Sequence, residues 1–427
     1  MRLLPVTLVV SVLVLAVMPA RAEASRYVRF GVQDDAWLQH GPGTLEERLD
    51  VLEGLGVDLV RFTIRWDRVA TRRPSNGRMH LDPAYDWGAT DAVLHGLRAR
   101  RITPLVTLLG TPRWANGGRS FNWAPLRGAH FGKFAYAAQK RYPFVREWLI
   151  WNEPNQRRWL RPTSPSVYVS RLLNPAYREI KRARRTAKVG GGVTAPRGSR
   201  GGVSPVDWIR GMDRARARLD AYAHHPYPLR PRIETPSSGG CGHCETITMA
   251  TLERLISHVR RAFGNKRIWL TEYGYQTRPH DRTILGVSQA QQARFLSEAA
   301  LRVYRAPFVD ILVKYMVVDD TKAAGWQSGL FTGAGKAKPS ARAFPLPIAQ
   351  LSRRGVRTVA WGQLRPRKGK QLYRLQQWRG RKWHWVGPKR RTDARGYYRR
   401  TVRAGRGSRL RIFSFADHTY SPIVRVR

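Results

Sequence analysis

Two glutamates follow two short apolar runs of the sequence. Trp148 to Trp151 is followed by Asn152 and Glu153, and Ile268 to Thr271 is followed by Glu272. Apolar runs of this length are typical of buried parallel strands, in which Glu is depleted. A pair of carboxyl groups could serve glycoside hydrolysis, in which one protonates the leaving oxygen and the other attacks the sugar. The alternative is that each Glu is a rim residue paired with one of the many Arg.

The elements that would position these glutamates alternate between strand-like and helix-like patterns. Helix signals include Thr44-x-x-Glu47, a capping box, and apolar residues at helical spacing between Met249 and Phe263. A single helix is also expected over 166–184. Eight strand-then-helix units predict an α/β fold, a (β/α)8 TIM barrel with its active site at the carboxyl ends of the strands. The eight expected strands are Phe30–Gln33, Leu59–Ile64, Thr103–Leu109, Trp148–Trp151, Lys188–Val193, Ala221–His225, Ile268–Thr271 and Ile311–Val318.

Two motifs carry a family resemblance. Trp151-Asn152-Glu153-Pro154-Asn155 and Trp269-Leu270-Thr271-Glu272-Tyr273-Gly274 together resemble the paired signature of the clan A glycoside hydrolases, which are retaining (β/α)8-barrel enzymes of cellulase-like and β-xylosidase-like families. The resemblance spans Arg29 to Phe344. It implies that Glu153, after the fourth strand, is the acid and base, and that Glu272, after the seventh, is the nucleophile. It also implies that Asn152 holds the sugar's 2-hydroxyl and that no metal or organic cofactor is required.

Three further site residues rest on the same resemblance. The clan often carries an Arg near the second strand that keeps the nucleophile ionised, and Arg61 is the matching candidate, although spacing does not separate it from Arg65 and Arg68. His225 and Tyr227 match the clan's His-x-Tyr sequence. In that sequence the Tyr hydroxyl donates to the nucleophile and the His lines the sugar subsite.

Aromatic residues supply the remaining candidate sugar contacts. Trp114 stands in a Gly/Pro-rich loop after the third strand, where its ring could stack on the apolar face of a sugar. Trp66 follows the second strand and is counted as a candidate contact. Many clan members place a Trp near the end of the eighth strand, but this chain has Met316 and Val317 there. We therefore expect Trp326, in the following loop, to provide that platform.

The only two cysteines are Cys241 and Cys244. In an exported chain, a Cys-x-x-Cys pair after a Gly/Ser/Pro-rich loop predicts a local disulfide. A zinc site would need two more ligands than His243 provides. His224 and His225 do not suggest a metal site either, because neighbouring strand residues point to opposite faces; a structural His pair stays open.

The two ends of the chain differ from the barrel region. Residues 1–24 have the order of a secretory signal peptide, with an uncleaved membrane anchor as the alternative. We predict a barrel over residues 25–348 and a basic all-β domain over 349–427, with an immunoglobulin-like sandwich as the candidate architecture. Its expected strands are 358–361, 372–377, 383–386, 410–415 and 423–426. We expect four tryptophans of this domain to pack in its core rather than to form a carbohydrate platform: Trp361, Trp378, Trp383 and Trp385.

The formal net charge is +48, with 77 Lys and Arg against 29 Asp and Glu. Such a charge is typical of proteins that bind nucleic acid or another polyanion. Here the basic residues are spread over the whole chain and Arg predominates, which a genome-wide codon bias also explains.

We expect a secreted or cell-surface glycosidase with a carbohydrate substrate. Polyanion or cell-wall contact through the basic C-terminal domain stays open, with no specific nucleic acid and no membrane contact after signal cleavage. The competing hypothesis is a non-catalytic sugar- or polyanion-binding protein on a barrel scaffold.

Overall fold

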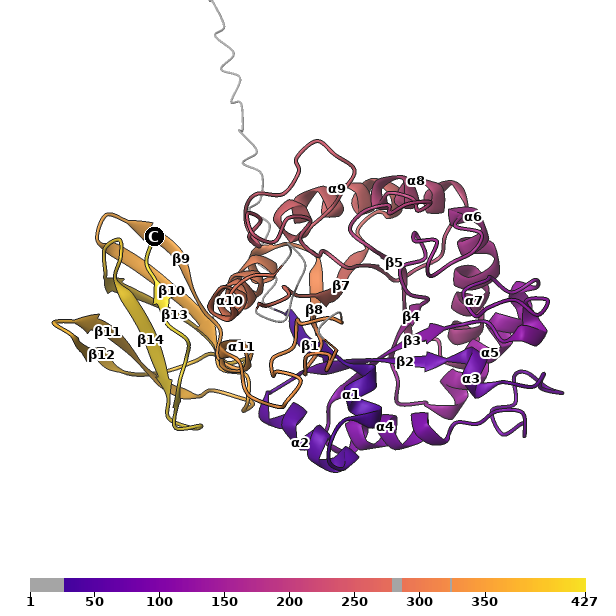
Figure 1. The fold of residues 1–427 in the computed structure, drawn as a ribbon, viewed down its shortest axis with the longest axis horizontal. Helices are drawn as coiled ribbons and strands as arrows, with labels where there is room; N and C mark the ends of the chain where they lie inside the picture. Colours follow the sequence, from indigo (N-terminus) through magenta and orange to yellow (C-terminus); the bar gives the residue numbers. More distant parts are fainter. Residues whose placement is uncertain (1–26, 279–285, 323–324) are drawn as a thin grey trace, which may run out of the picture.

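The computed structural model describes residues 27–278, 286–322 and 325–427, so the predicted signal segment lies outside the described residues. Eight parallel strands close into a barrel in chain order, with β1 pairing to both β2 and β8 (Figure 1). This confirms the predicted (β/α)8 fold. The strands are β1 (Arg29–Gln33), β2 (Leu59–Arg65), β3 (Thr103–Leu109), β4 (Glu147–Ile150), β5 (Lys188–Thr194), β6 (Ala221–His224), β7 (Arg267–Tyr273) and β8 (Val309–Tyr315).

Helices surround the barrel. The predicted capping box is present, because Thr44 and Glu47 exchange side-chain and backbone hydrogen bonds at the start of α2. The single helix expected over 166–184 is interrupted by a π-helical segment, η2. Pro175 lacks a backbone N–H and stands at the start of α7, which accounts for the break in the hydrogen-bond ladder. The helical elements are α1 (Asp35–His40), α2 (Leu45–Gly54), α3 (Trp66–Val69), α4 (Gly88–Ala99), η1 (Arg113–Ala115), α5 (Gly128–Arg141), α6 (Pro165–Tyr168), η2 (Val169–Leu173), α7 (Asn174–Ala183), α8 (Pro205–Arg214), η3 (Met249–Thr251), α9 (Leu252–Phe263), α10 (Gln289–Arg305) and α11 (Pro339–Ala343). No described helix is long and apolar enough to cross a membrane.

The barrel interior is a packed core rather than a channel. Side chains from alternating positions fill it, and the largest is Trp269. A Cβ at Gly190 would lie 2.8 Å from the Trp269 ring, so a glycine on β5 is required for the ring to fit. The interior residues are Leu59, Leu105, Leu149, Val193, Ala221, Ala223, Trp269, Ile311 and Val313. Because this core is closed, the chemistry is confined to the barrel's rim.

The C-terminal domain consists of two antiparallel sheets, which confirms the predicted all-β domain. A three-stranded sheet has the order β13-β10-β9, and a second sheet has the order β12-β11-β14-β15 with β16 beside β14. β9, β13 and β15 lie outside the strands expected from the sequence, because polar and charged residues obscure the apolar alternation of β9 and β13 and β15 has only two residues. The strands are β9 (Ile348–Arg354), β10 (Arg357–Gln363), β11 (Leu372–Arg379), β12 (Lys382–Arg391), β13 (Tyr397–Arg403), β14 (Arg409–Ser414), β15 (Thr419–Tyr420) and β16 (Val424–Arg425).

The three-stranded sheet faces the barrel, and the larger sheet lies on the far side of the domain (Figure 1). Trp361 of β10 is fully buried, with its ring 5.1 Å from that of Tyr304 on α10. Arg365 is buried as well. Its guanidinium lies 3.7 Å from the centre of the Phe30 ring and donates to the carbonyl of Phe344 at 2.7 Å. A buried cation with aromatic and carbonyl partners joins the two domains through a packed interface.

Candidate active site

The backbone after β4 is held in an unusual conformation. Trp151 and Glu153 have φ of 72° and 38°, in the left-handed region that non-glycine residues rarely adopt. The Trp151 ring is fully buried and its Nε1 donates to the carbonyl of Trp159 at 2.8 Å, while the Glu153 amide donates to the carbonyl of Val193 at 2.9 Å. Strain of this kind persists only where surrounding contacts hold it. Here it leaves both Asn152 and Glu153 lining the cleft.

A cleft of about 950 Å³ opens at the carboxyl ends of the strands. Loops after several different strands line it, as expected for a TIM barrel. Among its lining residues are Asn152, Glu153, Tyr227, Glu272, Tyr315 and Trp326. Two predicted strand ends, 119 positions apart in the sequence, therefore meet in one cavity.

Glu272 is held between a guanidinium and a phenol. Arg61 Nη1 donates to Glu272 Oε1 at 2.5 Å, and the Tyr227 hydroxyl donates to Glu272 Oε2 at 3.0 Å. Burial raises the pKa of Tyr227 well above its usual value, so the phenol keeps its proton and remains a donor. Both partners favour the charged carboxylate, which is the form required of a nucleophile.

Arg61 is itself fixed by several acceptors. Its side chain is 1% exposed, its Nε donates to the Thr107 hydroxyl at 3.0 Å, and its Nη1 donates to Gln33 Oε1 at 2.7 Å. Its Nη2 donates to Asn152 Oδ1 at 2.7 Å. Because Oδ1 of Asn152 is taken, the amide NH₂ of Asn152 is the group left for a ligand. The structure thus selects Arg61, rather than Arg65 or Arg68, as the cation beside Glu272.

Glu153 has a different environment. Burial raises its pKa to about 7, although Arg61 and a hydrogen bond from the Trp159 side chain oppose the shift. Its Oε1 lies 3.0 Å from His225 Nδ1. His225 is neutral, because burial lowers its pKa to about 3. Its Nε2 lies 3.3 Å from Arg61 Nη1, a group that only donates, so Nε2 accepts and Nδ1 carries the hydrogen.

The two carboxyl groups are close to each other. One oxygen of Glu153 and one of Glu272 lie within 4.8 Å, with a nitrogen of His225 inside the same limit. Retaining glycosidases hold their carboxyl groups about 5–5.5 Å apart, whereas inverting enzymes separate them by about 6.5–9.5 Å to admit a water. The limit of 4.8 Å in this cleft lies below the inverting range.

The same three side chains could in principle ligate a cation. A guanidinium already occupies that role, however, since Arg61 lies 2.5 Å from Glu272 and 3.3 Å from His225. A divalent ion placed between them would have to approach this fixed positive charge at close range, which is unfavourable at low dielectric.

An aromatic wall borders the cleft on the β8 side. Trp326 is 42% exposed, and its ring lies 5.5 Å from that of Tyr227 and 5.8 Å from that of Tyr315. Tyr315 ends β8, directly before Met316. The loop tryptophan therefore stands in the cleft where the sequence suggested it, and Tyr315 joins it.

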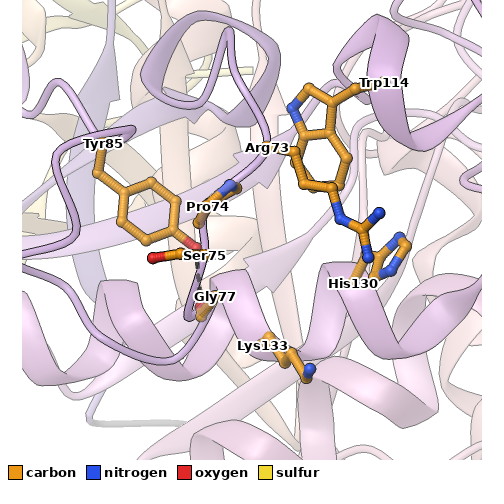
Figure 2. Close-up of a pocket in the computed structure, with 8 residues that line it drawn as sticks. All are labelled: Arg73, Pro74, Ser75, Gly77, Tyr85, Trp114, His130 and Lys133. Carbon is orange, nitrogen blue, oxygen red and sulfur yellow. Dashed lines mark hydrogen bonds between the residues drawn. The ribbon is translucent and has the colours of Figure 1, made fainter.

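Two tryptophans expected to contact sugar do not reach this cleft. Trp66 is 0% exposed, because α3 begins at this residue and its ring packs among Trp114, Phe131 and Phe134. Trp114 donates from Nε1 to the carbonyl of Ala70 at 2.8 Å. Its free side lines a separate pocket with Arg73, His130 and Lys133 (Figure 2). Both expectations are corrected: packing against Trp66 orients Trp114 away from the glutamates.

Other cleft residues were not anticipated. Gln33 and Thr107 hold Arg61, and Asp35, Gln156 and Arg158 line the cavity. Gln33 ends β1, Glu153 follows β4 and Glu272 is the second-last residue of β7, so a polar residue at a strand's carboxyl end was a usable signal. Thr107 lies within a strand-like apolar run, and nothing in its sequence context marks it.

The end of β6 and the loop after it contain the remaining predicted features. His224 points away from the cleft: its Nδ1 lies 2.8 Å from the Thr194 hydroxyl and its Nε2 lies 3.0 Å from the carbonyl of Ile247. The two histidines thus face opposite sides, and His224 is structural. Cys241 and Cys244 form the predicted disulfide.

Comparisons with known proteins identify the family of the barrel. Residues 130–344, half of the 427-residue chain, match the family described as the glycosyl hydrolase catalytic core. A solved family 39 glycoside hydrolase from Bacteroides cellulosilyticus WH2 is 18% identical, with a TM-score of 0.57 over 88% of this chain and 79% of that one. A glucosidase from Croceicoccus marinus is 14% identical, with a TM-score of 0.60 over 95% and 97% of the two chains.

A third solved structure extends the likeness. The catalytic domain of GH30 xylanase C from Talaromyces cellulolyticus is 12% identical, with a TM-score of 0.53 over 92% of this chain and 98% of its own. At such identities the three structures show a shared fold. No curated protein matches the sequence.

Proposed function

The chain belongs to the glycosyl hydrolase catalytic core family and is a glycosidase, and we propose that it cleaves O-glycosidic bonds of an oligo- or polysaccharide with retention of configuration. The observation that carries the proposal is the unequal setting of two adjacent carboxyl groups. Glu153 holds a proton near neutral pH, and Glu272 accepts from Arg61 and Tyr227. Two adjacent carboxyl groups in unlike surroundings divide the acid and nucleophile roles.

The first chemical step uses both groups at once. Glu153 protonates the leaving oxygen while Glu272 attacks the anomeric carbon, which forms a covalent glycosyl–enzyme intermediate. Asn152 donates from its amide to the sugar's 2-hydroxyl, a contact that strengthens in the transition state. In the second step Glu153, now ionised, takes a proton from water, and the water displaces Glu272. His225 orients Glu153, and Tyr227 is released from Glu272 as that carboxylate becomes an ester.

Two substitutions separate these roles. Glu153→Ala should be far more damaging on substrates with poor leaving groups than on activated aryl glycosides, which need little protonation. Azide should partly restore its turnover of the activated substrates, since a small anion can attack the intermediate. Glu272→Ala should lose activity on every substrate, because no intermediate forms. Any azide rescue of that variant should give an inverted product.

Kinetics on a panel of aryl glycosides and polysaccharides, with product stereochemistry by NMR, tests the proposal. Circular dichroism of Glu153→Gln and Glu272→Gln, which keep the side-chain volume, controls for folding. Losses of only a few fold that are equal for both variants and independent of the leaving group would mean that neither Glu carries out the chemistry. A non-catalytic sugar-binding protein would then be the better reading.

We also propose that the protein is exported to the cell surface or the medium. The N-terminal pattern of residues 1–24 supports this. Mass spectrometry of protein from the native host should find an amino terminus close to residue 25. A chain that retains Met1 and fractionates with membranes would identify an anchor instead.

A further inference from the structure

The sheet of the C-terminal domain that lies away from the barrel has two unlike faces. Tyr373 and Leu375 of β11, with Leu410 and Ile412 of β14, point inward and form the domain's core with the three-stranded sheet. The alternate residues point outward. The strand register places Trp385 of β12 opposite Gln376, and it places Arg411 on the other side of Gln376. This outer face is on the side of the domain farthest from the barrel (Figure 1).

The outer face interleaves aromatic rings with cations. We call it the distal face, made of Arg374, Trp378, Trp383, Trp385, Arg411, Phe413 and Tyr420. The guanidinium of Arg411 lies 4.1 Å from the centre of the Trp383 ring and 3.8 Å from that of Tyr420. The guanidinium of Arg374 lies 5.0 Å from the Trp385 ring. Stacking of this kind holds the cations in place over a flat surface without neutralising them.

The cations of the distal face have no acidic partner among the residues that the structure describes. Arg374 donates from Nε to the carbonyl of Gly387 at 2.9 Å, and Arg411 donates from Nε to Gln376 Oε1 at 2.8 Å. The terminal nitrogens of each guanidinium are left for an external acceptor. Asp417 is the acid nearest to Arg411 in the sequence, and it pairs with Arg367 at 3.4 Å. The face is therefore positively charged within a segment, residues 351–427, that holds 23 Lys and Arg against two Asp.

The rings remain accessible to a ligand. Trp385 is 42% exposed and Trp378, Trp383, Phe413 and Tyr420 are half-buried, unlike Trp361 at the barrel interface, which is fully buried. An exposed tryptophan on a flat sheet costs solubility unless a partner covers it, so such a cluster marks an interaction site. Core packing, which the sequence favoured for these tryptophans, holds for Trp361 only.

We propose that the distal face binds an acidic polysaccharide, a glycan whose sugar rings carry carboxylate groups. The CH faces of pyranose rings stack on Trp385 and its neighbours, and the carboxylates accept from the terminal nitrogens of Arg374 and Arg411. A polymer lying across β12, β11 and β14 meets both kinds of group in turn. The surface belongs to a chain whose barrel acts on carbohydrate, so it tethers the enzyme to glycan and raises the local concentration of bonds to cleave. That last step rests on the proposed function, whereas the binding itself does not.

Binding is tested with the catalytically silenced full chain, Glu272→Gln, so that no polymer is consumed. The probes are polygalacturonate, a neutral polysaccharide such as xylan, and single-stranded DNA, each in 150 mM salt. The variants are Trp385→Ala, the double variant Arg374→Ala/Arg411→Ala, and a control of equal charge change, Arg354→Ala/Arg357→Ala. The control residues are exposed and pair with each other across β9 and β10, in the other sheet.

We expect polygalacturonate to bind more tightly than xylan or DNA. Trp385→Ala and the distal arginine pair should each weaken binding about tenfold or more, which corresponds to the loss of one well-placed contact. The control pair should change it little. Equal losses from both arginine pairs would show attraction by diffuse charge and overturn the proposal, as would tighter binding to DNA or no binding at all.

Turnover separates this inference from the proposed function. On a soluble aryl glycoside, Trp385→Ala in the active enzyme should leave kcat/KM unchanged, because the distal face is not part of the cleft. An enzyme that proves inactive on every glycoside would refute the proposed function and leave the binding result standing.

Discussion

Arginine has opposite roles in the cleft and on the distal face. Arg61 is 1% exposed and its donors are occupied by Thr107, Gln33, Asn152 and Glu272. Arg374 and Arg411 lie on aromatic rings, and they have no acidic partner among the described residues. The buried arginine orders other residues, whereas the half-buried ones are available to a partner. The role of a guanidinium therefore depends on how far it is desolvated and on which acceptors surround it. A count of the arginines in the sequence shows neither.

The largest expected effect is at Arg61. Arg61→Gln should lower kcat/KM about 10²–10³-fold, the cost of removing one preorganised electrostatic partner. Arg374→Ala/Arg411→Ala should not change kcat/KM on the same soluble aryl glycoside. Circular dichroism and Tm check that Arg61→Gln is folded. If Arg61→Gln and Arg374→Ala/Arg411→Ala lowered kcat/KM alike, the contrast between an arginine that orders its neighbours and arginines that are available to a partner would be wrong.

A substitution at Tyr227 tests the hydrogen bond that this residue donates to Glu272 in the cleft. Tyr227→Phe removes one donor to Glu272 and should lower kcat roughly tenfold to a hundredfold, the range for a hydrogen bond to a charged group. Because the ring is retained, contact with Trp326 is kept and KM should change less than kcat. Steady-state kinetics measures both, and a change confined to KM would mean that Tyr227 only lines the subsite.

The pH dependence reports on Glu153. With its pKa raised to about 7, the acid form predominates below that pH, and activity should fall about tenfold per unit above it as the proton is lost. The alkaline limb should be absent from the residual activity of Glu153→Gln on activated substrates. A pH–rate profile of kcat/KM tests this. An alkaline limb that persisted in the variant would belong to another group.

The same shift has a smaller consequence for stability. Between the ordinary carboxyl pKa and about 7, folded Glu153 keeps a proton that the unfolded chain releases, so folding becomes less favourable as pH rises. Glu153→Gln removes this penalty. Its Tm advantage over the wild type should therefore be larger at pH 8 than at pH 4. An advantage independent of pH would mean that Glu153 titrates normally in the folded protein.

A chelator should have no effect. The Arg61 guanidinium beside Glu272 and His225 supplies the positive charge that a metal would bring to the cleft. Activity after dialysis against EDTA should equal that of the untreated enzyme. A loss that zinc or calcium restored would instead assign Glu153, His225 and Glu272 as ligands.

The fold was predictable because its signals are local. Apolar runs such as Leu105 to Leu108 define buried strands, and the Thr44–Glu47 capping box begins a helix within four residues of chain. Errors arose where a local signal was weak or ambiguous. β13 has three Arg among seven residues, and the helix expected over 166–184 contains Pro175. For β13 the pairing with β10 decided the conformation, whereas in the helix Pro175 itself interrupted the hydrogen-bond ladder.

In the candidate site, too, some residues were predictable from local signals and others were not. Asn152, Glu153 and Glu272 were identifiable because polar residues at the ends of apolar runs conflict with burial. Trp66 and Trp114 show the limit of that reasoning, since an aromatic residue in a loop can stack on a ligand or on another ring, and its sequence context is the same in both cases. Only the packing of Trp66 among Trp114, Phe131 and Phe134 excluded them from the cleft.

By itself the sequence determined the barrel, its two catalytic carboxyl candidates and an all-β domain at the end, because periodicity and residue type are properties of short segments. Tertiary structure decided which arginine faces Glu272, which nitrogen of His225 carries the hydrogen, and which tryptophans are exposed. These depend on distances between residues far apart in the chain, such as Arg61 and Glu272, or Arg411 and Trp383. Desolvation and hydrogen bonding act over a few ångströms in space, and the order of residues does not encode those distances locally.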